Sequence, residues 1–122
     1  MNIIFGTENV ANVDSKYIVL ELDTIRLLPI GKEVTAYCLV EHVAIPDMPR
    51  IESMKDLHVN LLKNYKNKDW NFCAQALEHL IGFWGGEVDT FYGALQGRIA
   101  EFVKQDPGND WDPVIDKILP ID

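Results

Sequence analysis

The chain has 122 residues, of which 48% are hydrophobic and 25% are charged. This is enough for one hydrophobic core, and it excludes a chain that is disordered throughout. With 19 acidic and 11 basic residues the net charge is −8, which disfavours binding to nucleic acid or to anionic lipid. No run approaches the ~18 apolar residues of a membrane span, and the first ten residues lack the basic and long apolar regions of a signal peptide, so we expect neither feature. We therefore expect a single cytoplasmic domain, residues 1–122, without nucleic-acid or membrane partners.

The N-terminal part, residues 1–43, has the pattern of a β-hairpin region. Residues 3–5 are apolar and predict a short strand, and the polar residues that follow predict turns. Residues 17–28 alternate apolar and polar side chains, and residues 33–43 resume strand character after a short break that contains Pro29 and Gly31. Two long runs joined by so short a break predict an antiparallel hairpin.

After a proline-containing linker at residues 44–50, the spacing of apolar residues becomes helical. It predicts one helix over residues 51–66 and a second helix that Asp69 caps. A third begins at Asp89 or Glu87, so the helical region covers residues 51–105. The fold class we predict is α+β: an N-terminal antiparallel β-hairpin region, then three helices and a short C-terminal tail.

Small residues in the helical region predict close helix packing. Gly93 and Gly97 lie four residues apart in the third helix, where glycine is otherwise unfavourable. Tyr65 and Ala74 stand nine residues apart, and this helix pair resembles a tetratricopeptide unit, in which a small residue lets two helices approach. Because a stable array needs about three repeats, we expect one repeat-like pair packed on a sheet, with Ala74 at the helix crossing.

The tail, residues 106–122, is acidic but also rich in apolar residues. Pro113 suits the first turn of a short helix, with Asp112 as its cap. We expect Trp111 to pack against the helical region. The alternative is a mobile tail in which Trp111 anchors another protein or a second copy of this chain.

Three segments, in the same order, resemble the C-terminal part of class III nucleotide cyclases. The hairpin matches that family's hairpin at Glu21, Asp23, Arg26, Val34 and Tyr37. The helical segment after it matches a helical tail found in many bacterial cyclases at Tyr65, Lys68, Asp69, Trp70 and Ala74. The last match is a segment in which Asp106-Pro107 is followed by Trp111-Asp112.

This resemblance implies cyclase-related ancestry, and it speaks against cyclase activity. The two metal-binding aspartates of the family lie on strands upstream of the hairpin, and we expect no room for those strands here. The position of the lysine that contacts the nucleotide phosphates is Leu28, and the turn glycine after it is Pro29. The arginine of the family's asparagine-arginine helix is replaced by Val13.

The residues themselves indicate no catalytic, cofactor-binding or metal-binding constellation. His42, His58 and His79 lack the spacing of a metal motif. Cys38 and Cys73 lie among apolar neighbours and predict buried free thiols. We therefore expect a non-catalytic protein-interaction or regulatory module, without a cofactor, that acts on a protein partner or as a homodimer. The alternatives are a small enzyme or ligand-binding protein of cyclase-related ancestry, or a structural accessory protein such as a viral one.

Two carboxylates on the first long strand, Glu21 and Asp23, form a second pattern with chemical meaning. Such a pair can bind a hard cation or act as acid and base. It is also typical of a strand face that is simply solvated, and this is the interpretation we prefer.

Aromatic residues around the loop after the second helix, and in the tail, are the candidates for partner binding. They are Phe83, Trp84, Tyr92 and Trp111. Exposed aromatic side chains dominate the energies of many interfaces. The alternative for Trp84 is a place in the core between the second and third helices.

Overall fold

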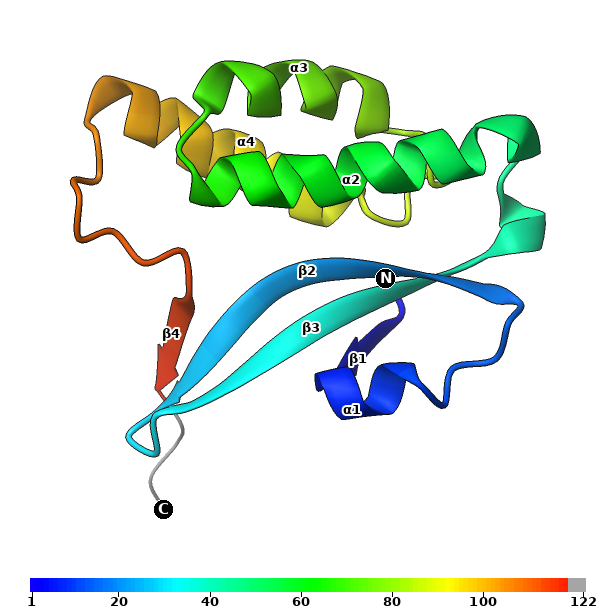
Figure 1. Ribbon diagram of the computed structural model, residues 1–122, viewed down its shortest axis with the longest axis horizontal. Coiled ribbons are helices and arrows are strands. Elements are labelled where there is room, and N and C mark those ends of the chain that lie inside the picture. Colours follow the sequence, from blue (N-terminus) through cyan, green and yellow to red (C-terminus); the bar gives the residue numbers. More distant parts are fainter. Residues whose placement is uncertain (119–122) are drawn as a thin grey trace.

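The computed structural model describes residues 1–118, and it confirms the predicted α+β architecture. Figure 1 shows the helical region lying over one face of a twisted sheet. The strands are β1 (Ile3–Phe5), β2 (Tyr17–Leu28), β3 (Lys32–Glu41) and β4 (Ile115–Ile118). The helices are α1 (Thr7–Val10), α2 (Ile51–Lys66), α3 (Trp70–Leu80) and α4 (Asp89–Lys104), with 3-10 turns η1 (His42–Ala44) and η2 (Met48–Arg50).

The sheet has the strand order β1-β3-β2-β4. β2 and β3 form the predicted antiparallel hairpin, and β1 pairs antiparallel with the other edge of β3. β4 pairs in parallel with β2, from Ile25 opposite Ile115 to Leu28 opposite Ile118. The tail therefore adds a strand to the sheet only beside the C-terminal end of β2.

A β-bulge interrupts the hairpin near the middle of β2. Glu21 pairs with Tyr37, but the next pair joins Thr24 to Thr35, so β2 contains one extra residue there. Because side chains alternate along a strand, the extra residue shifts the alternation by one. Leu20 before the bulge and Ile25 after it therefore face the same side of the sheet.

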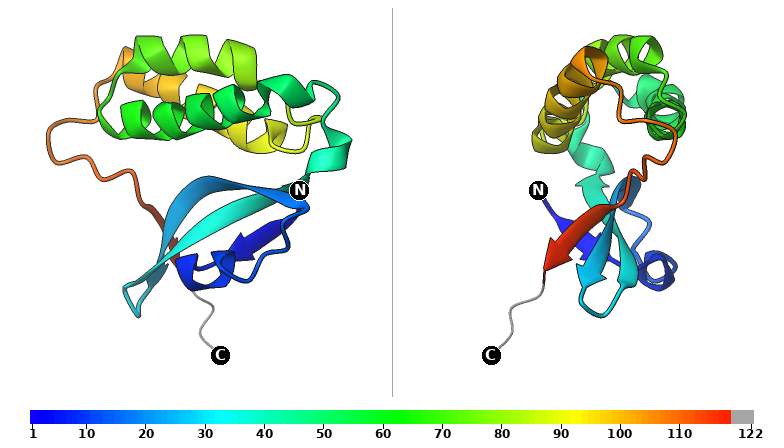
Figure 2. Two further views of the ribbon diagram at one scale, coloured as in Figure 1. Left: turned by 45° about the vertical axis from the view of Figure 1, so that its right-hand side comes forward. Right: turned by 90° about the vertical axis from the view of Figure 1, so that its left-hand side faces the viewer.

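The core lies between this face of the sheet and the helices. The two views of Figure 2 place α2 and α4 next to the sheet and α3 on the far side of them. The most deeply buried apolar residues include Ile18, Cys38, Val40, Leu61, Cys73, Leu77, Leu80 and Leu95. Both cysteines are buried and free, as predicted, and burial raises the pKa of Cys73 to about 11.

The start of α3 confirms the predicted cap, whereas the two glycines of α4 do not serve close packing. Asp69 accepts a hydrogen bond from the backbone N–H of Phe72 at 3.1 Å. Gly93 and Gly97 are exposed, and a Cβ atom built on either would meet nothing within 4 Å. The expectation of close backbone packing there is therefore wrong.

Two further segments differ from the prediction. Thr7–Val10 forms the single turn of α1 instead of an irregular turn. The predicted tail helix is wrong, because Ile115–Ile118 forms β4. Asp112 does accept a hydrogen bond from the N–H of Val114 at 3.0 Å, but the chain then extends and pairs with β2. Residues 119–122 of the predicted tail lie outside the described residues.

The buried small residue of α3 also differs from the one predicted. Ala74 is exposed, whereas Ala76 is 2% exposed and belongs to the core. We expect Ala76→Leu to lower the free energy of unfolding by about 1–3 kcal/mol, because the core has no room for the larger side chain. The same substitution at Ala74 is the matched control, and we expect a change of at most about 0.5 kcal/mol. Urea denaturation of both variants measures this, and equal midpoints would contradict it.

Candidate functional site

The outer edge of β2 is paired along only part of its length. β4 covers Ile25–Leu28, and within residues 1–118 no strand pairs with this edge before the bulge. The backbone N–H of His42, directly after β3, donates to the C=O of Lys16, and in alternation with it Ile18 and Leu20 bond to β3. The backbone groups of Val19 therefore point to the outer edge. We call the unpaired stretch of β2, residues 17–21, the open edge.

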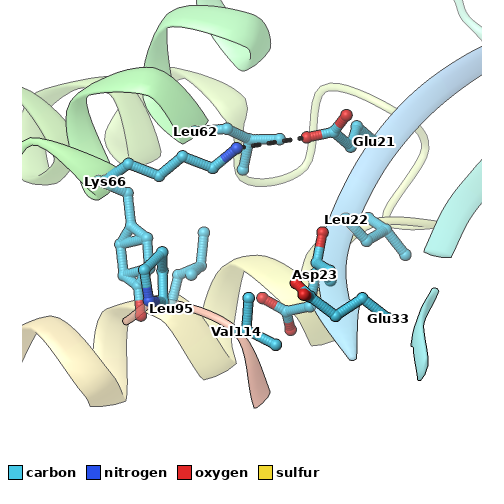
Figure 3. A pocket seen from close by; sticks show the side chains of 11 residues that line it. Glu21, Leu22, Asp23, Glu33, Leu62, Lys66, Leu95 and Val114 are labelled. Carbon is cyan, nitrogen blue, oxygen red and sulfur yellow. Dashed lines mark ion pairs between the residues drawn. The ribbon is translucent and has the colours of Figure 1, made fainter. Parts of the chain in front are cut away.

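A groove lies between β2 and α2 and meets the open edge at its last residue, Glu21. It consists of an inner hollow of about 260 Å³ and an outer hollow of about 360 Å³, which share Glu21, Leu62 and Lys66. The outer hollow is also lined by Val59 and Lys63 of α2. The inner hollow, shown in Figure 3, is also lined by Leu22, Asp23, Thr24, Glu33, Tyr65, Leu95, Pro113 and Val114. Residues from β2, β3, α2, α4 and the tail therefore meet in one cavity.

An ion pair joins one lining residue of the inner hollow, Asp23, to α4. The guanidinium of Arg98, from α4, donates one hydrogen bond to each carboxylate oxygen of Asp23, both at 2.9 Å. This bidentate geometry is the strongest form of such a pair. The carboxylate of Asp23 raises the pKa of Arg98 further above its ordinary value. The charge of Asp23 is thus matched within the fold, and the pair ties the bulge to α4.

The other charged residues of the inner hollow are less firmly paired. Lys66 reaches across the groove toward Glu21, as Figure 3 shows, but the two charged atoms are 4.0 Å apart and both side chains are exposed. Such surface pairs contribute little to stability. Glu33 lies opposite Arg26 in the hairpin, but the guanidinium of Arg26 pairs with Asp112 and Asp116 of the tail instead. Within the described residues Glu33 has no ion pair.

A buried hydrogen-bond chain fixes the edge of the groove at the bulge. The imidazole of His58, which is 1% exposed, lies with Nε2 2.6 Å from the backbone oxygen of Glu21 and with Nδ1 2.8 Å from the hydroxyl of Tyr92. The indole N–H of Trp84 donates to that same hydroxyl at 2.9 Å. Because a carbonyl can only accept, Nε2 carries the proton, and in the neutral imidazole Nδ1 accepts from the hydroxyl of Tyr92.

The neutral form of this imidazole is favoured by its burial. Burial lowers the pKa of His58, and the hydrogen bond to Glu21 opposes this effect only in part. The neutral ring thus joins α2 to the backbone of β2 at the point where the open edge ends.

The tail closes one end of the inner hollow. The indole of Trp111 packs against the rings of Tyr65, Trp70 and Phe102, with ring centroids 5.3, 5.7 and 5.2 Å away. Arg26 of β2 donates to Asp112 at 2.6 Å and to Asp116 at 3.2 Å. Between these contacts, Pro113 and Val114 line the hollow.

The four residues predicted to bind a partner do not form one surface. Trp84 and Tyr92 are 0% exposed, so Trp84 belongs to the core, and neither ring is accessible to a partner in this structure. Phe83 is half-buried against Trp84, with the guanidinium of Arg50 over its ring. Trp111 is half-buried and packs on the helical region, as expected.

The groove was not predicted from the sequence. Glu21 and Asp23 were interpreted as a solvated strand face, but they belong to the groove, and Asp23 is paired with Arg98. The signal that points to them is the pattern Leu20-Glu21-Leu22-Asp23-Thr24-Ile25, in which the apolar alternation slips by one residue. That slip indicates a bulge, and bulges are common next to functional sites.

Comparisons with protein-family models, with curated proteins and with solved structures gave no match for this chain. Among residues 1–118, no helix has both the length and the apolar character needed to cross a membrane. In the same part of the chain, no three side chains of His, Cys, Asp or Glu are grouped so that they could hold a metal ion.

Proposed function

We propose that this protein is a non-catalytic protein-interaction module that binds an extended segment of a protein partner along the open edge of β2. In this mode of recognition a peptide adds a strand to an exposed sheet edge, and its side chains enter adjacent pockets. The observation that carries the proposal is the open edge at residues 17–21, which meets the groove at Glu21. Edges of this kind readily pair with another chain unless they are protected.

The tail supports the proposal because it already uses the same edge. β4 is an extended segment that pairs with β2 over Ile25–Leu28, and its contacts continue into the groove through Pro113 and Val114. A partner segment on the open edge would extend the row of backbone hydrogen bonds that β4 begins on the other side of the bulge. The edge of β2 is thus suited to strand addition along its length.

The backbone groups available to a partner follow from the register. They are the C=O of Tyr17, both groups of Val19 and the N–H of Glu21. The N–H of Tyr17 donates to Asp14, and the C=O of Glu21 accepts from His58. Alternate side chains of the bound segment would face α2 and contact Val59, which is 62% exposed, and Leu62.

Val19→Pro tests the proposal. Proline removes the outward N–H of residue 19 but no hydrogen bond of the hairpin, and edge strands tolerate it. We expect the variant to fold normally and to lose binding to peptides that the unmodified chain selects from a displayed random library. Val19→Thr retains the N–H and is the matched control. If Val19→Pro binds the selected peptides as tightly as Val19→Thr does, or if the library yields no binding peptide, the proposal is wrong.

The hairpin residues that resemble class III cyclases have partners within this fold. Asp23 pairs with Arg98, Arg26 holds the tail, and Glu21 faces Lys66. Each of these contacts shapes the groove. Cyclase-related ancestry stays a prediction, and binding of a partner segment does not depend on it.

A further inference from the structure

We infer that the segment bound at the open edge of β2 carries a lysine or arginine side chain, which enters the inner hollow. This inference rests on the proposed function, and it names the chemistry of the partner. It follows from the charge, the shape and the position of the hollow.

The charge of the inner hollow favours a cation. Its charged lining residues are the three carboxylates of Glu21, Asp23 and Glu33 and the single ammonium of Lys66. Arg98 compensates Asp23 with two hydrogen bonds, and Lys66 is only loosely paired with Glu21. Within residues 1–118, the carboxylate of Glu33 therefore has no ion pair. It would repel an acidic side chain of a bound segment and attract a basic one.

The walls of the hollow fit the stem of a long basic side chain. Leu22, Leu62, Leu95 and Val114 supply apolar surface, and the carboxylates stand at the side of β2 and β3. Lysine and arginine pack their methylene groups on apolar surface and keep the charged end in a polar or hydrated environment. A short polar side chain would leave the apolar walls uncovered.

The position of the hollow fixes where the basic residue lies in the segment. Glu21 is both the last residue of the open edge and part of the hollow's lining. Beyond it, Pro113 and Val114 of the tail close the cavity. The basic residue is thus at the end of the paired stretch next to the bulge, and one such residue fills the site.

Peptide selection with matched charge variants tests the inference. We expect peptides selected from a random displayed library on the unmodified chain to share a lysine or arginine at one position. Glu33→Gln should weaken binding of these peptides about tenfold, because one charge-assisted contact is lost. Glu33→Lys should select peptides with an acidic residue at that position instead. Glu52→Gln is the control, since Glu52 is exposed on α2 and does not line the groove.

The outcomes separate this inference from the proposed function. If peptides bind through the open edge but share no basic residue, or if Glu33→Gln and Glu52→Gln affect binding equally, the inference is wrong and the proposed function stands. If no peptide binds, both are wrong. A basic preference that Glu33→Gln removes and Glu33→Lys reverses would support both.

Discussion

Replacing His58 with alanine is expected to lower the free energy of unfolding by about 3 kcal/mol. The substitution leaves the hydroxyl of Tyr92 without its acceptor and the backbone oxygen of Glu21 without its donor, and it opens a cavity beneath α2. Urea denaturation at neutral pH measures the loss. His79→Ala is the control, because His79 is exposed on α3. Equal stabilities of the two variants would contradict the role of the buried hydrogen-bond chain.

The same residue gives the protein a defined sensitivity to acid. Since burial lowers the pKa of His58 below the ordinary value of 6.5, the unfolded chain binds a proton that the folded protein excludes. The contribution of His58 is therefore complete above about pH 6.5 and is lost as the pH falls toward the folded pKa, by up to ~1.4 kcal/mol per pH unit. Glutamine does not titrate, so His58→Gln should reduce this acid-side slope, measured by denaturation between pH 7 and pH 5. An unchanged slope would contradict the assignment.

Trp111→Ala is expected to release the tail and to lower the free energy of unfolding by about 2 kcal/mol. Trp111 is half-buried, and its ring contacts three other aromatic rings, so the substitution removes both apolar burial and favourable ring geometry. Without this anchor, β4 is held mainly by four residues of parallel pairing and by the exposed ion pairs of Arg26, which contribute little.

Hydrogen exchange measures the release directly. We expect the backbone amides of β4 to exchange much faster in Trp111→Ala than in the unmodified chain, while the amides of β2 that bond to β3 change little. Asp110→Ala is the control, because Asp110 is exposed and adjacent to Trp111 in the chain. Slow exchange in β4 of the Trp111→Ala variant would show that the tail docks without its aromatic anchor.

Local patterns in the sequence were sufficient to predict most of the secondary structure. The alternation in residues 17–28 and 33–43 predicted the hairpin, because a strand with one buried face must alternate. The helical spacing of apolar residues and the cap at Asp69 predicted α2 and α3. These features depend on interactions between residues close in the chain, so the sequence contains them directly.

Packing details depended on the orientation of whole elements. The sequence offered Ala74, Gly93 and Gly97 as close-packing positions, but all three are exposed, and Ala76 is in the core instead. A shift of two residues along a helix moves a side chain to the other side, because each residue turns the helix by about 100°. The composition of a helix therefore indicates that it packs, whereas its rotation about its own axis is set by its neighbours.

The slip in alternation at residues 20–25 marks the bulge in the sequence, but only the tertiary structure decided the open edge and the groove. Asp112 and Pro113 favoured a helix locally, but the backbone groups of β2 offered hydrogen bonds that a tail helix could not make, and Arg26 offered partners for Asp112 and Asp116. β4 pairs only with Ile25–Leu28 of β2. The earlier part of β2 is therefore left without a partner on this side, and this gives the open edge and the groove. Residues so far apart in the chain leave no periodic signal, because their contact depends on the path of every element between them.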